Sequence, residues 1–211
     1  MYTPAEFSMS DPRTLADFIE ANSFATLVSY DGGFPKATHL PLLLDRDTGD
    51  RGQLVGHMAR ANPQWKSIDS QNVLAVFHGP HAYISSSWYE TDQAVPTWNY
   101  VVAHVHGTCN IVDDRDSVLE IVRQYMDVYE RQHQQANRTR PASEDYIQNI
   151  LSATVGFRIA IDRIEGTWKL SQNHDPARRE NVVRRLRELG GDQRNQVAEL
   201  MSETLKKSGD A

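Results

Sequence analysis

The feature that most constrains the fold is a series of short apolar segments, each bounded by residues that favour tight turns. The first, Phe24–Tyr30, is rich in β-favouring residues and is followed by Asp-Gly-Gly at 31–33. Because aspartate and glycine tolerate positive φ, these three residues predict a hairpin turn. The returning segment, Lys36–Leu44, contains Pro41, which has no amide hydrogen to donate to a sheet ladder. This strand is therefore predicted to lie at a sheet edge or to be bulged at Pro41.

Further strands are predicted where short apolar or alternating runs lie between turn residues. Gly79-Pro80 is predicted to separate two of them, because proline interrupts the hydrogen bonding of a strand. In the longest run, a period of two places the even-numbered residues from Tyr100 to His106 on one face and the odd-numbered residues from Val101 to Val105 on the other. The strands predicted after Leu44 are Gln53–Met58, Val73–Phe77, Ala82–Trp88, Thr97–Val112 and Val155–Ile164.

Helix signals precede, interrupt and follow these strands. Ser10-Asp11-Pro12 combines a capping side chain with a proline in the first turn, and Asn62-Pro63 does the same for a short helix over Ala61–Ser70. Apolar residues at helical spacing predict an amphipathic helix over 115–132, which the polar segment Gln132–Pro141 interrupts. Later helices are predicted over Asp145–Leu151, from Asp175-Pro176 to Gly190-Gly191, and around Val197, Leu200 and Met201.

These elements together predict an α+β fold. About six strands with tight hairpins, followed by helices, are typical of an antiparallel barrel that carries peripheral helices. The barrel is assigned to a domain at residues 1–173, and the last helices to a helical C-terminal tail at 174–211. A chain of 211 residues is long enough to bury one substantial core.

Charge and cysteine content disfavour several classes of protein. The formal net charge is −6, which disfavours nucleic-acid binding by the whole surface, because phosphate contacts need a clustered positive field. Cys109 is the single cysteine, so an intrachain disulfide is impossible and a reducing compartment is expected. The first residues, MYTPAEFSMSD, have no basic and apolar signal regions, and no apolar run approaches the roughly 20 residues that span a bilayer. A cytoplasmic protein without a membrane segment is expected.

Motifs for metal, nucleophilic or nucleotide-triphosphate chemistry are absent from the sequence. The histidines lack H-E-x-x-H or Cys/His spacing, so ordinary hydrogen-bonded histidines are favoured over a metal site. The serines at 85–87 lack the G-x-S-x-G turn, and no cationic pattern accompanies Cys109 to lower the pKa of its thiol. No catalytic residue and no metal ligand is assigned, and enzymatic activity is left open.

Several cationic and hydroxyl side chains indicate an anion site instead. Arg60 directly precedes a predicted helix start, where free amide hydrogens attract anions. Lys169 and the Ser-Gln-Asn sequence at 171–173 follow the final predicted strand, while Thr38 and His39 lie on the strand broken by proline. Solvated loop residues are the commoner explanation for any one such cation. Together with four tryptophans, however, the set favours a binding site for a flat, phosphorylated ligand.

Five spaced motifs resemble one known family. They are ATHLPLLLD, GHMARANPQW, HGPHAYISSSWY, AVPTWNY and WKLSQN. These motifs are similar to those of the PaiB-type family, FMN-binding negative transcriptional regulators, and the similarity covers nearly the whole chain to about Asn173. The resemblance implies a split-barrel flavin-binding fold, a homodimer, and one FMN per site at the subunit interface.

The same resemblance implies roles for individual residues. The FMN phosphate is expected at Arg60 and at the backbone of Ala61 and Asn62, with Lys169 reaching it from the other subunit. The remaining cofactor-binding residues are expected around the rest of the flavin. They are Thr38, His39 and Leu40 against the isoalloxazine or ribityl chain, His57, Trp98 and Asn99 lining the pocket, and Ser171 and Gln172 closing it.

Two functions remain as alternatives. One is an FMN-binding transcriptional regulator of the PaiB type; the other is a flavin-dependent oxidoreductase, like NAD(P)H-linked flavin reductases, with no direct DNA binding. The sequence has no clear helix-turn-helix, and its one basic cluster, Arg178–Arg187, is typical of a solvated helix face. Weak or absent direct DNA binding is therefore expected. The enzyme alternative stays open because flavin chemistry needs few protein groups.

Overall fold

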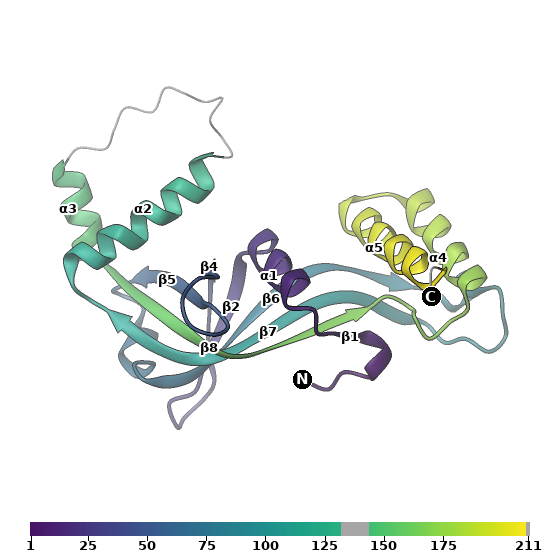
Figure 1. Ribbon diagram of the computed structural model, residues 1–211, viewed down its shortest axis with the longest axis horizontal. Coiled ribbons are helices and arrows are strands. Elements are labelled where there is room, and N and C mark those ends of the chain that lie inside the picture. Colours follow the sequence, from purple (N-terminus) through teal and green to yellow (C-terminus); the bar gives the residue numbers. More distant parts are fainter. Residues whose placement is uncertain (132–143, 210–211) are drawn as a thin grey trace. The chain divides into compact units, whose positions relative to one another are not determined.

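The structure is a computed structural model that describes residues 1–131 and 144–209 (Figure 1). Within these ranges the chain forms two compact units. Unit 1 contains Met1–Phe18, His78–His104 and the segment from Glu165 onward, and unit 2 contains Ile19–Phe77 and Val105–Ile164. The polar break predicted at Gln132–Pro141 lies outside the described residues.

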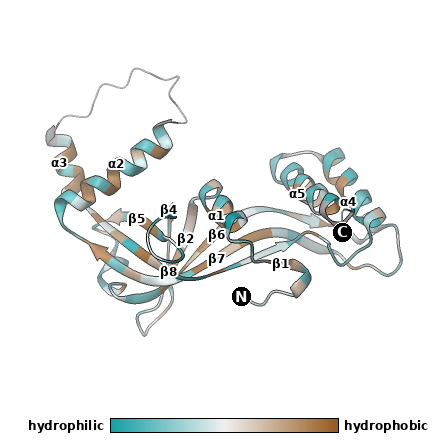
Figure 2. Cartoon of the chain, viewed as in Figure 1, coloured by the Kyte–Doolittle hydropathy of each residue, from teal (hydrophilic) through white to brown (hydrophobic). Residues whose placement is uncertain are grey.

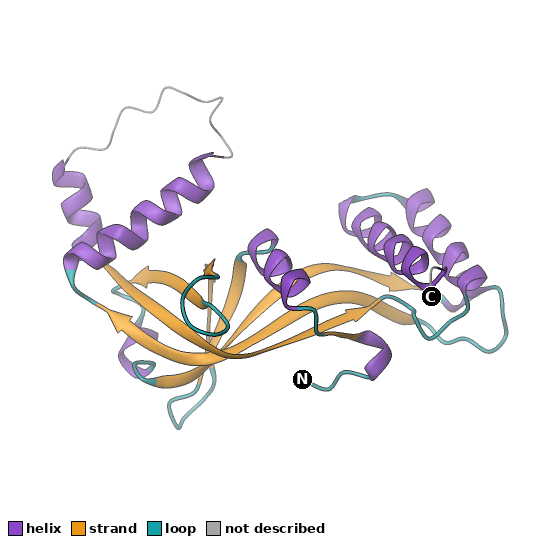
Figure 3. Ribbon diagram, in the orientation of Figure 1, coloured by secondary structure: helices purple, strands orange, loops and turns teal. Residues whose placement is uncertain are grey.

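The described strands form one sheet (Figure 3). Their order is β3-β2-β6-β7-β8-β5-β4, and β1 pairs with β8. The predicted α+β class is confirmed, and the sheet has more strands than the six or so expected because β1 and β4 are too short to produce an alternating pattern. The strands are β1 (Ser8–Met9), β2 (Phe24–Ser29), β3 (Lys36–Pro41), β4 (Leu43–Asp45), β5 (Gln53–Ala59), β6 (Gln71–Ile84), β7 (Thr97–Val112) and β8 (Thr154–Lys169).

The helices begin largely where capping residues predict them. The Asp11 side chain accepts a hydrogen bond from the Thr14 amide at 2.7 Å, and the Asp175 side chain accepts one from the Arg178 amide at 3.0 Å. No helix in the described part of the chain has the length and apolar character that crossing a membrane requires. The α-helices are α1 (Pro12–Ala21), α2 (Arg115–Arg131), α3 (Glu144–Ser152), α4 (Pro176–Leu189) and α5 (Asp192–Gly209), and the 3-10 helices are η1 (Ala5–Phe7), η2 (Pro63–Ser67) and η3 (Ser86–Tyr89).

Unit 2 buries one face of its strands as a continuous apolar layer. Leu27 pairs with Ala75 across β2 and β6, and Leu54 pairs with Ile159 across β5 and β8. All four side chains are fully buried. Because successive strand residues point to opposite faces, this register directs the other half of each strand toward the outer face of the sheet.

Helix α2 covers the outer face of unit 2 at β5. Val55 packs there against Ile121 and Tyr125 of the helix. The Tyr125 hydroxyl donates toward the carbonyl oxygens of Pro41, at 2.7 Å, and Val55, at 2.9 Å. This tyrosine therefore ties the helix to backbone groups of two strands while filling the apolar contact.

Unit 1 contains the pair α4 and α5, whose facing sides are apolar. Val182, Leu186, Val197 and Met201 are fully buried, whereas Figure 2 shows that the other sides of both helices are mostly hydrophilic. The two helices belong to the same compact unit as His78–His104. The domain boundary predicted between residues 173 and 174 stays a prediction.

The break predicted at Gly79-Pro80 is wrong, because β6 is one continuous strand. The pairing of β6 with β2 reaches only to Phe77. Proline is tolerated in a strand that has a neighbour on one side only, since fewer of its amides need a ladder partner. The strand predicted over Ala82–Trp88 is accordingly the end of β6 followed by η3. A local sequence window does not show where a neighbouring strand stops.

Three other boundaries differ from prediction. The helix expected over Ala61–Ser70 is the shorter 3-10 helix η2, which Asn62 caps by accepting a hydrogen bond from the Gln64 amide. The strand expected over Lys36–Leu44 is split into β3 and β4 just after Pro41, and β3 lies at the sheet edge as predicted. The last strand continues to Lys169 because its end gains β1 as a partner.

The longest strand, β7, covers the predicted segment Thr97–Val112. Its odd-numbered residues from Val101 to Val105 are at most 2% exposed, while the even-numbered residues from Tyr100 to His106 are half-buried. The predicted alternation is confirmed. The strand therefore buries one face and leaves the other face partly exposed to solvent.

Candidate functional site

In unit 2 the structure joins two of the predicted site residues in one hydrogen-bond network. Asn62 Nδ2 donates to Thr38 Oγ1 at 2.9 Å, and Thr38 Oγ1 donates in turn to the side chain of Gln64. Gln64 is 2% exposed, and its Nε2 also donates to Ser29 Oγ at 2.8 Å. The network fixes the start of η2 against β2 and β3. Sequence reasoning missed Gln64, although it lies in the same GHMARANPQW motif.

His39 and Leu40, the two residues that follow Thr38 on β3, point to different faces. His39 lies on the outer face, where its Nδ1 is 3.0 Å from Thr26 Oγ1, while Leu40 is 6% exposed on the inner face. Successive strand residues alternate in this way. β3 is an edge strand. A ligand that touches Thr38, His39 and Leu40 together would therefore have to lie along that edge.

Arg60 is already bound by protein groups. Its Nε donates to the Ser152 carbonyl at 3.0 Å, one Nη2 hydrogen donates to the Thr154 carbonyl at 3.0 Å, and Nη1 and Nη2 both donate to the Asp113 carboxylate. The guanidinium carbon also lies 5.8 Å from the centre of the Trp65 ring. The hydrogen bond to Asp113 raises the pKa of Arg60. Sequence reasoning missed Asp113, which lies beyond the motif.

His57, another predicted residue, lies beside Tyr125 under α2. The two rings are 4.5 Å apart and meet edge to face. His57 Nδ1 is buried and has no hydrogen-bond partner among the residues that the structure describes, and burial lowers the pKa of this histidine. A neutral imidazole at this position acts as part of the packing between β5 and α2. Ala61, the remaining predicted residue in this unit, is exposed next to η2.

In unit 1 the structure brings Asn99 and Ser171 together. Asn99 Nδ2 donates to Ser171 Oγ at 3.0 Å, and the Ser171 hydroxyl lies 2.7 Å from the hydroxyl of Tyr89. All three residues are buried. Gln172 closes the adjoining turn, because its Nε2 donates to the Trp168 carbonyl at 2.6 Å. Tyr89 was missed at the sequence level, although the SSSWY motif contains it.

Lys169 lines a cavity of about 410 Å³ within unit 1, and Glu6 also lines it. Its ammonium donates to Thr97 Oγ1 at 2.7 Å, and no carboxylate binds it among the described residues. His174 stacks on Tyr89 in the same wall, with ring centres 4.1 Å apart. Burial, reinforced by Arg178, lowers the pKa of His174. Asn99 and Ser171 also line this cavity, so three predicted residues share it.

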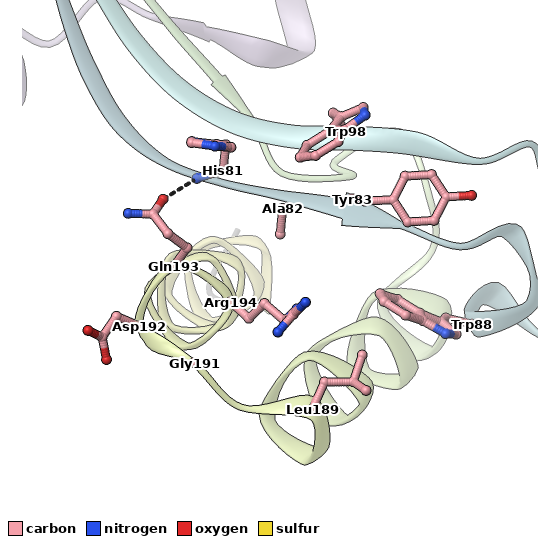
Figure 4. A pocket seen from close by; sticks show the side chains of 10 residues that line it. All are labelled: His81, Ala82, Tyr83, Trp88, Trp98, Leu189, Gly191, Asp192, Gln193 and Arg194. Atoms are coloured by element: carbon pink, nitrogen blue, oxygen red, sulfur yellow. Dashed lines mark hydrogen bonds between the residues drawn. The ribbon is translucent and has the colours of Figure 1, made fainter.

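Trp98 points away from that group, into a second cavity of unit 1. Its side chain is 53% exposed and lines a space of about 530 Å³ together with residues of β6, η3 and α5 (Figure 4). Alternation along β7 separates Trp98 from its neighbour Asn99. The structure therefore divides the predicted residues of unit 1 between two cavities.

The remaining candidates are bound or buried. Burial raises the pKa of Cys109 to about 12, so its thiol is not a nucleophile. In the Arg178–Arg187 cluster, Arg179 is 3% exposed. The other arginines of the cluster bind neighbouring groups: Arg178 binds Asp175, Arg184 binds Glu90, Arg185 binds Glu188, and Arg187 binds the Ser202 hydroxyl.

Comparison with solved structures identifies the fold. The flavocytochrome Anf3 from Azotobacter vinelandii superposes with a TM-score of 0.56 at 18% identity, covering 77% of this chain and 69% of that one. An FAD- and heme-binding protein from Mycobacterium smegmatis superposes with a TM-score of 0.53 at 17% identity, covering 77% and 73%. Identities this low establish the fold alone, and that fold is the flavin-binding split barrel.

Sequence comparison then gives the family. Residues 1–163 match the family model FMN_bind_2, described as "Putative FMN-binding domain", and the chain belongs to this family. It is 36% identical to the Protease synthase and sporulation protein PAI 2 of Bacillus subtilis over 98% of this chain and 99% of that protein. An uncharacterized protein of Emericella nidulans is 28% identical over 80% of this chain and 81% of that protein. The resemblance to the PaiB-type family and the expectation of FMN as cofactor are confirmed at the level of the family.

Proposed function

We propose that the protein is an FMN-binding transcriptional regulator of the PaiB type, with the flavin held at a homodimer interface. The observation that carries this proposal is the likeness to the Bacillus subtilis protein over practically the full length of both chains. The family match supports the cofactor, and the regulatory role rests on the resemblance of the sequence motifs to the PaiB-type family.

For the FMN phosphate we assign Lys169, reaching the flavin from the other subunit, as the principal cation. An ammonium has three N–H donors, and Thr97 accepts only one of them. Arg60 contributes less, because four of its five N–H donors are already bound to Asp113, Ser152 and Thr154. Asn62 and Thr38 are assigned to the flavin side of η2, where their polar network presents hydroxyl and amide groups.

A homodimer is supported by the outer face of β2 and β6 in unit 2. Val28 pairs with Leu74 there, next to Val76, and all three side chains are only half-buried. Phe24 on the same face is 65% exposed. Contiguous apolar surface of this kind marks an association site, and a two-fold dimer covers it with the same surface of a second copy.

Direct DNA binding is not part of the proposal. The basic cluster on α4 is the one candidate that the sequence offers, and neighbouring carboxylates neutralise Arg178, Arg184 and Arg185. A surface that binds phosphates needs free positive charge. Regulation is therefore assigned to the state of the bound flavin or ligand, and not to DNA binding by α4.

The test is a pair of titrations on the purified protein, with FMN and with riboflavin, followed by flavin fluorescence. FMN should bind at least tenfold more tightly, since the phosphate adds a charge-assisted hydrogen bond of about 1.5–3 kcal/mol. Sedimentation of the wild type and of Val76→Glu should show a dimer and a monomer respectively. Equal affinities for the two flavins would refute the phosphate assignment. Bleaching of bound FMN by NADH or NADPH would favour the oxidoreductase alternative.

A further inference from the structure

The side-chain amide of Gln64 can take only one orientation in its network. Gln64 is 2% exposed, and its Nε2 donates toward the carbonyl oxygens of Leu27 and Lys36, both at 3.4 Å. Because a backbone carbonyl accepts hydrogen bonds and cannot donate them, the NH2 group of the amide has to face these two oxygens. Oε1 therefore faces Thr38, whose hydroxyl donates its single hydrogen to Gln64.

The side-chain amide of Asn62 is fixed by the same kind of contact. Its Oδ1 accepts a hydrogen bond from the backbone N–H of Gln64 at 3.0 Å, and a backbone N–H can only donate. Its Nδ2 therefore faces Thr38 and donates to Oγ1 at 2.9 Å. A hydroxyl group has one hydrogen and two lone pairs. With the hydrogen on Gln64 and one lone pair on Asn62, Thr38 offers a ligand one lone pair and no hydrogen.

The two side chains that face a ligand here are an acceptor and a donor. Thr38, on the edge strand β3, and Asn62, at the start of η2, are only half-buried. Asn62 Nδ2 has a second N–H besides the one that it donates to Thr38. An acceptor 2.9 Å from a donor is complementary to a cyclic amide, in which an N–H adjoins a carbonyl group. The isoalloxazine ring has such an edge at its imide, where N3–H lies between two carbonyl groups.

We propose that Thr38 recognises the imide edge of the flavin by accepting a hydrogen bond from N3–H, and that Gln64 is the positioning residue that keeps the Thr38 hydroxyl accepting. Asn62 donates to the adjoining ring carbonyl. The inference rests on the proposed function, and it names the part of FMN that the Thr38 side of the site recognises.

The ribityl chain is the main competitor for Thr38, because its hydroxyl groups can also donate. A hydroxyl both donates and accepts, so it gains nothing from a partner whose direction is fixed. An imide N–H only donates, and it is matched only by a partner that accepts. The fixed direction of the Thr38 hydrogen therefore favours the imide over the ribityl chain.

The experiment compares FMN with 3-methyl-FMN, in which a methyl group replaces the N3 hydrogen. Both are titrated into the full-length protein freed of flavin and are followed by fluorescence. FMN should bind the wild type about tenfold more tightly, because the methylated ring loses one hydrogen bond. Thr38→Val should remove this preference, Gln64→Met should reduce it, and Thr38→Ser, which keeps the hydroxyl, should retain it. Thr48→Val, in an exposed turn, is the matched control and should retain it as well.

A second measurement separates the hydrogen bond from the bulk of the methyl group. In NMR spectra of bound, isotopically labelled FMN, the N3 proton should exchange slowly with solvent in the wild type and in Thr38→Ser. It should exchange faster in Thr38→Val and in Gln64→Met. The preference for FMN over riboflavin should stay at its wild-type value in all these variants, because they leave the phosphate contact in place.

The possible outcomes separate this inference from the proposed function. Equal affinities of the wild type for FMN and 3-methyl-FMN would overturn the inference and leave FMN binding intact. Slow exchange of the N3 proton in Thr38→Val would also overturn it. If Thr38→Val does not fold, an exchange rate in Gln64→Met equal to that of the wild type has the same meaning. A protein that binds neither flavin would overturn the proposed function and this inference together.

Discussion

Arg60 in unit 2 and Lys169 in unit 1 have the same predicted role, and the structure gives them opposite surroundings. Arg60 is held by one carboxylate and two backbone carbonyls, whereas Lys169 has one hydroxyl partner beside a cavity. A cation that is satisfied by its own fold stabilises that fold. A cation with unused donors at a cavity is free to bind a ligand. The difference shows that the hydrogen-bond partners of a cation, more than its position beside a motif, distinguish a structural cation from one that binds a ligand.

The largest expected effect that tests this comparison is on cofactor affinity. Lys169→Met should weaken FMN binding by tenfold or more and leave riboflavin binding unchanged, because only FMN has the phosphate that the ammonium would bind. Fluorescence titration measures both affinities. Lys66→Met, which removes an exposed lysine of η2, is the control and should change neither value. An equal loss of affinity for both flavins would mean that Lys169 supports the site without binding the phosphate.

The second expected effect is on stability and depends on pH. Arg60 holds the pKa of Asp113 below its usual 3.8, so the folded state favours the ionised carboxylate. This contribution is present above pH 3.8 and is lost as the pH falls through the lowered pKa. Asp113→Asn should therefore reduce the free energy of unfolding at neutral pH, and the difference from wild type should shrink in acid.

Urea denaturation at several pH values measures this difference, with Asp116→Asn as the control because its side chain is 93% exposed. Arg60→Ala should behave like Asp113→Asn and should affect FMN affinity less than Lys169→Met does. If Arg60→Ala abolishes FMN binding without lowering stability, the contrast between the two cations is wrong.

The smallest expected effect concerns His57, which the structure places in the packing under α2. Burial lowers its pKa below 6.5, so the unfolded chain takes up a proton at a higher pH than the folded chain does. Stability should consequently fall as the pH drops below 6.5, and His57→Leu should flatten this slope. Denaturation at about pH 7.5 and about pH 5.5 compares the two proteins. His39→Leu, on the exposed face of β3, should retain the slope; a slope that His57→Leu leaves unchanged would assign it to other groups.

Much of the fold could be predicted from local chemistry. Alternation defined β7, and capping residues with proline marked the starts of α1 and α4. The break at Gly79-Pro80 was mispredicted because the tolerance for Pro80 depends on where β2 stops pairing, which is a property of a distant segment. Local sequence patterns indicate local conformation, whereas the pairing of one strand with another is decided only in the assembled sheet.

The candidate site shows the same limit more strongly. The motifs located the regions, but they did not separate Trp98 from Asn99, which face two different cavities. Nor did they reveal that Asp113 binds Arg60, because that carboxylate lies 53 residues further along the chain. Pairwise contacts of this kind are set by tertiary structure. The predicted cofactor, in contrast, needed only the order and composition of the motifs.

The burial of Cys109 has a practical consequence. It is the only thiol of the chain, it is fully enclosed in the core of unit 2, and its pKa is raised to about 12. An alkylating reagent can therefore modify the native protein only after this core has opened. The rate of labelling at this single position reports the frequency of such openings. A change in that rate on adding flavin would measure how far the cofactor suppresses local unfolding of unit 2.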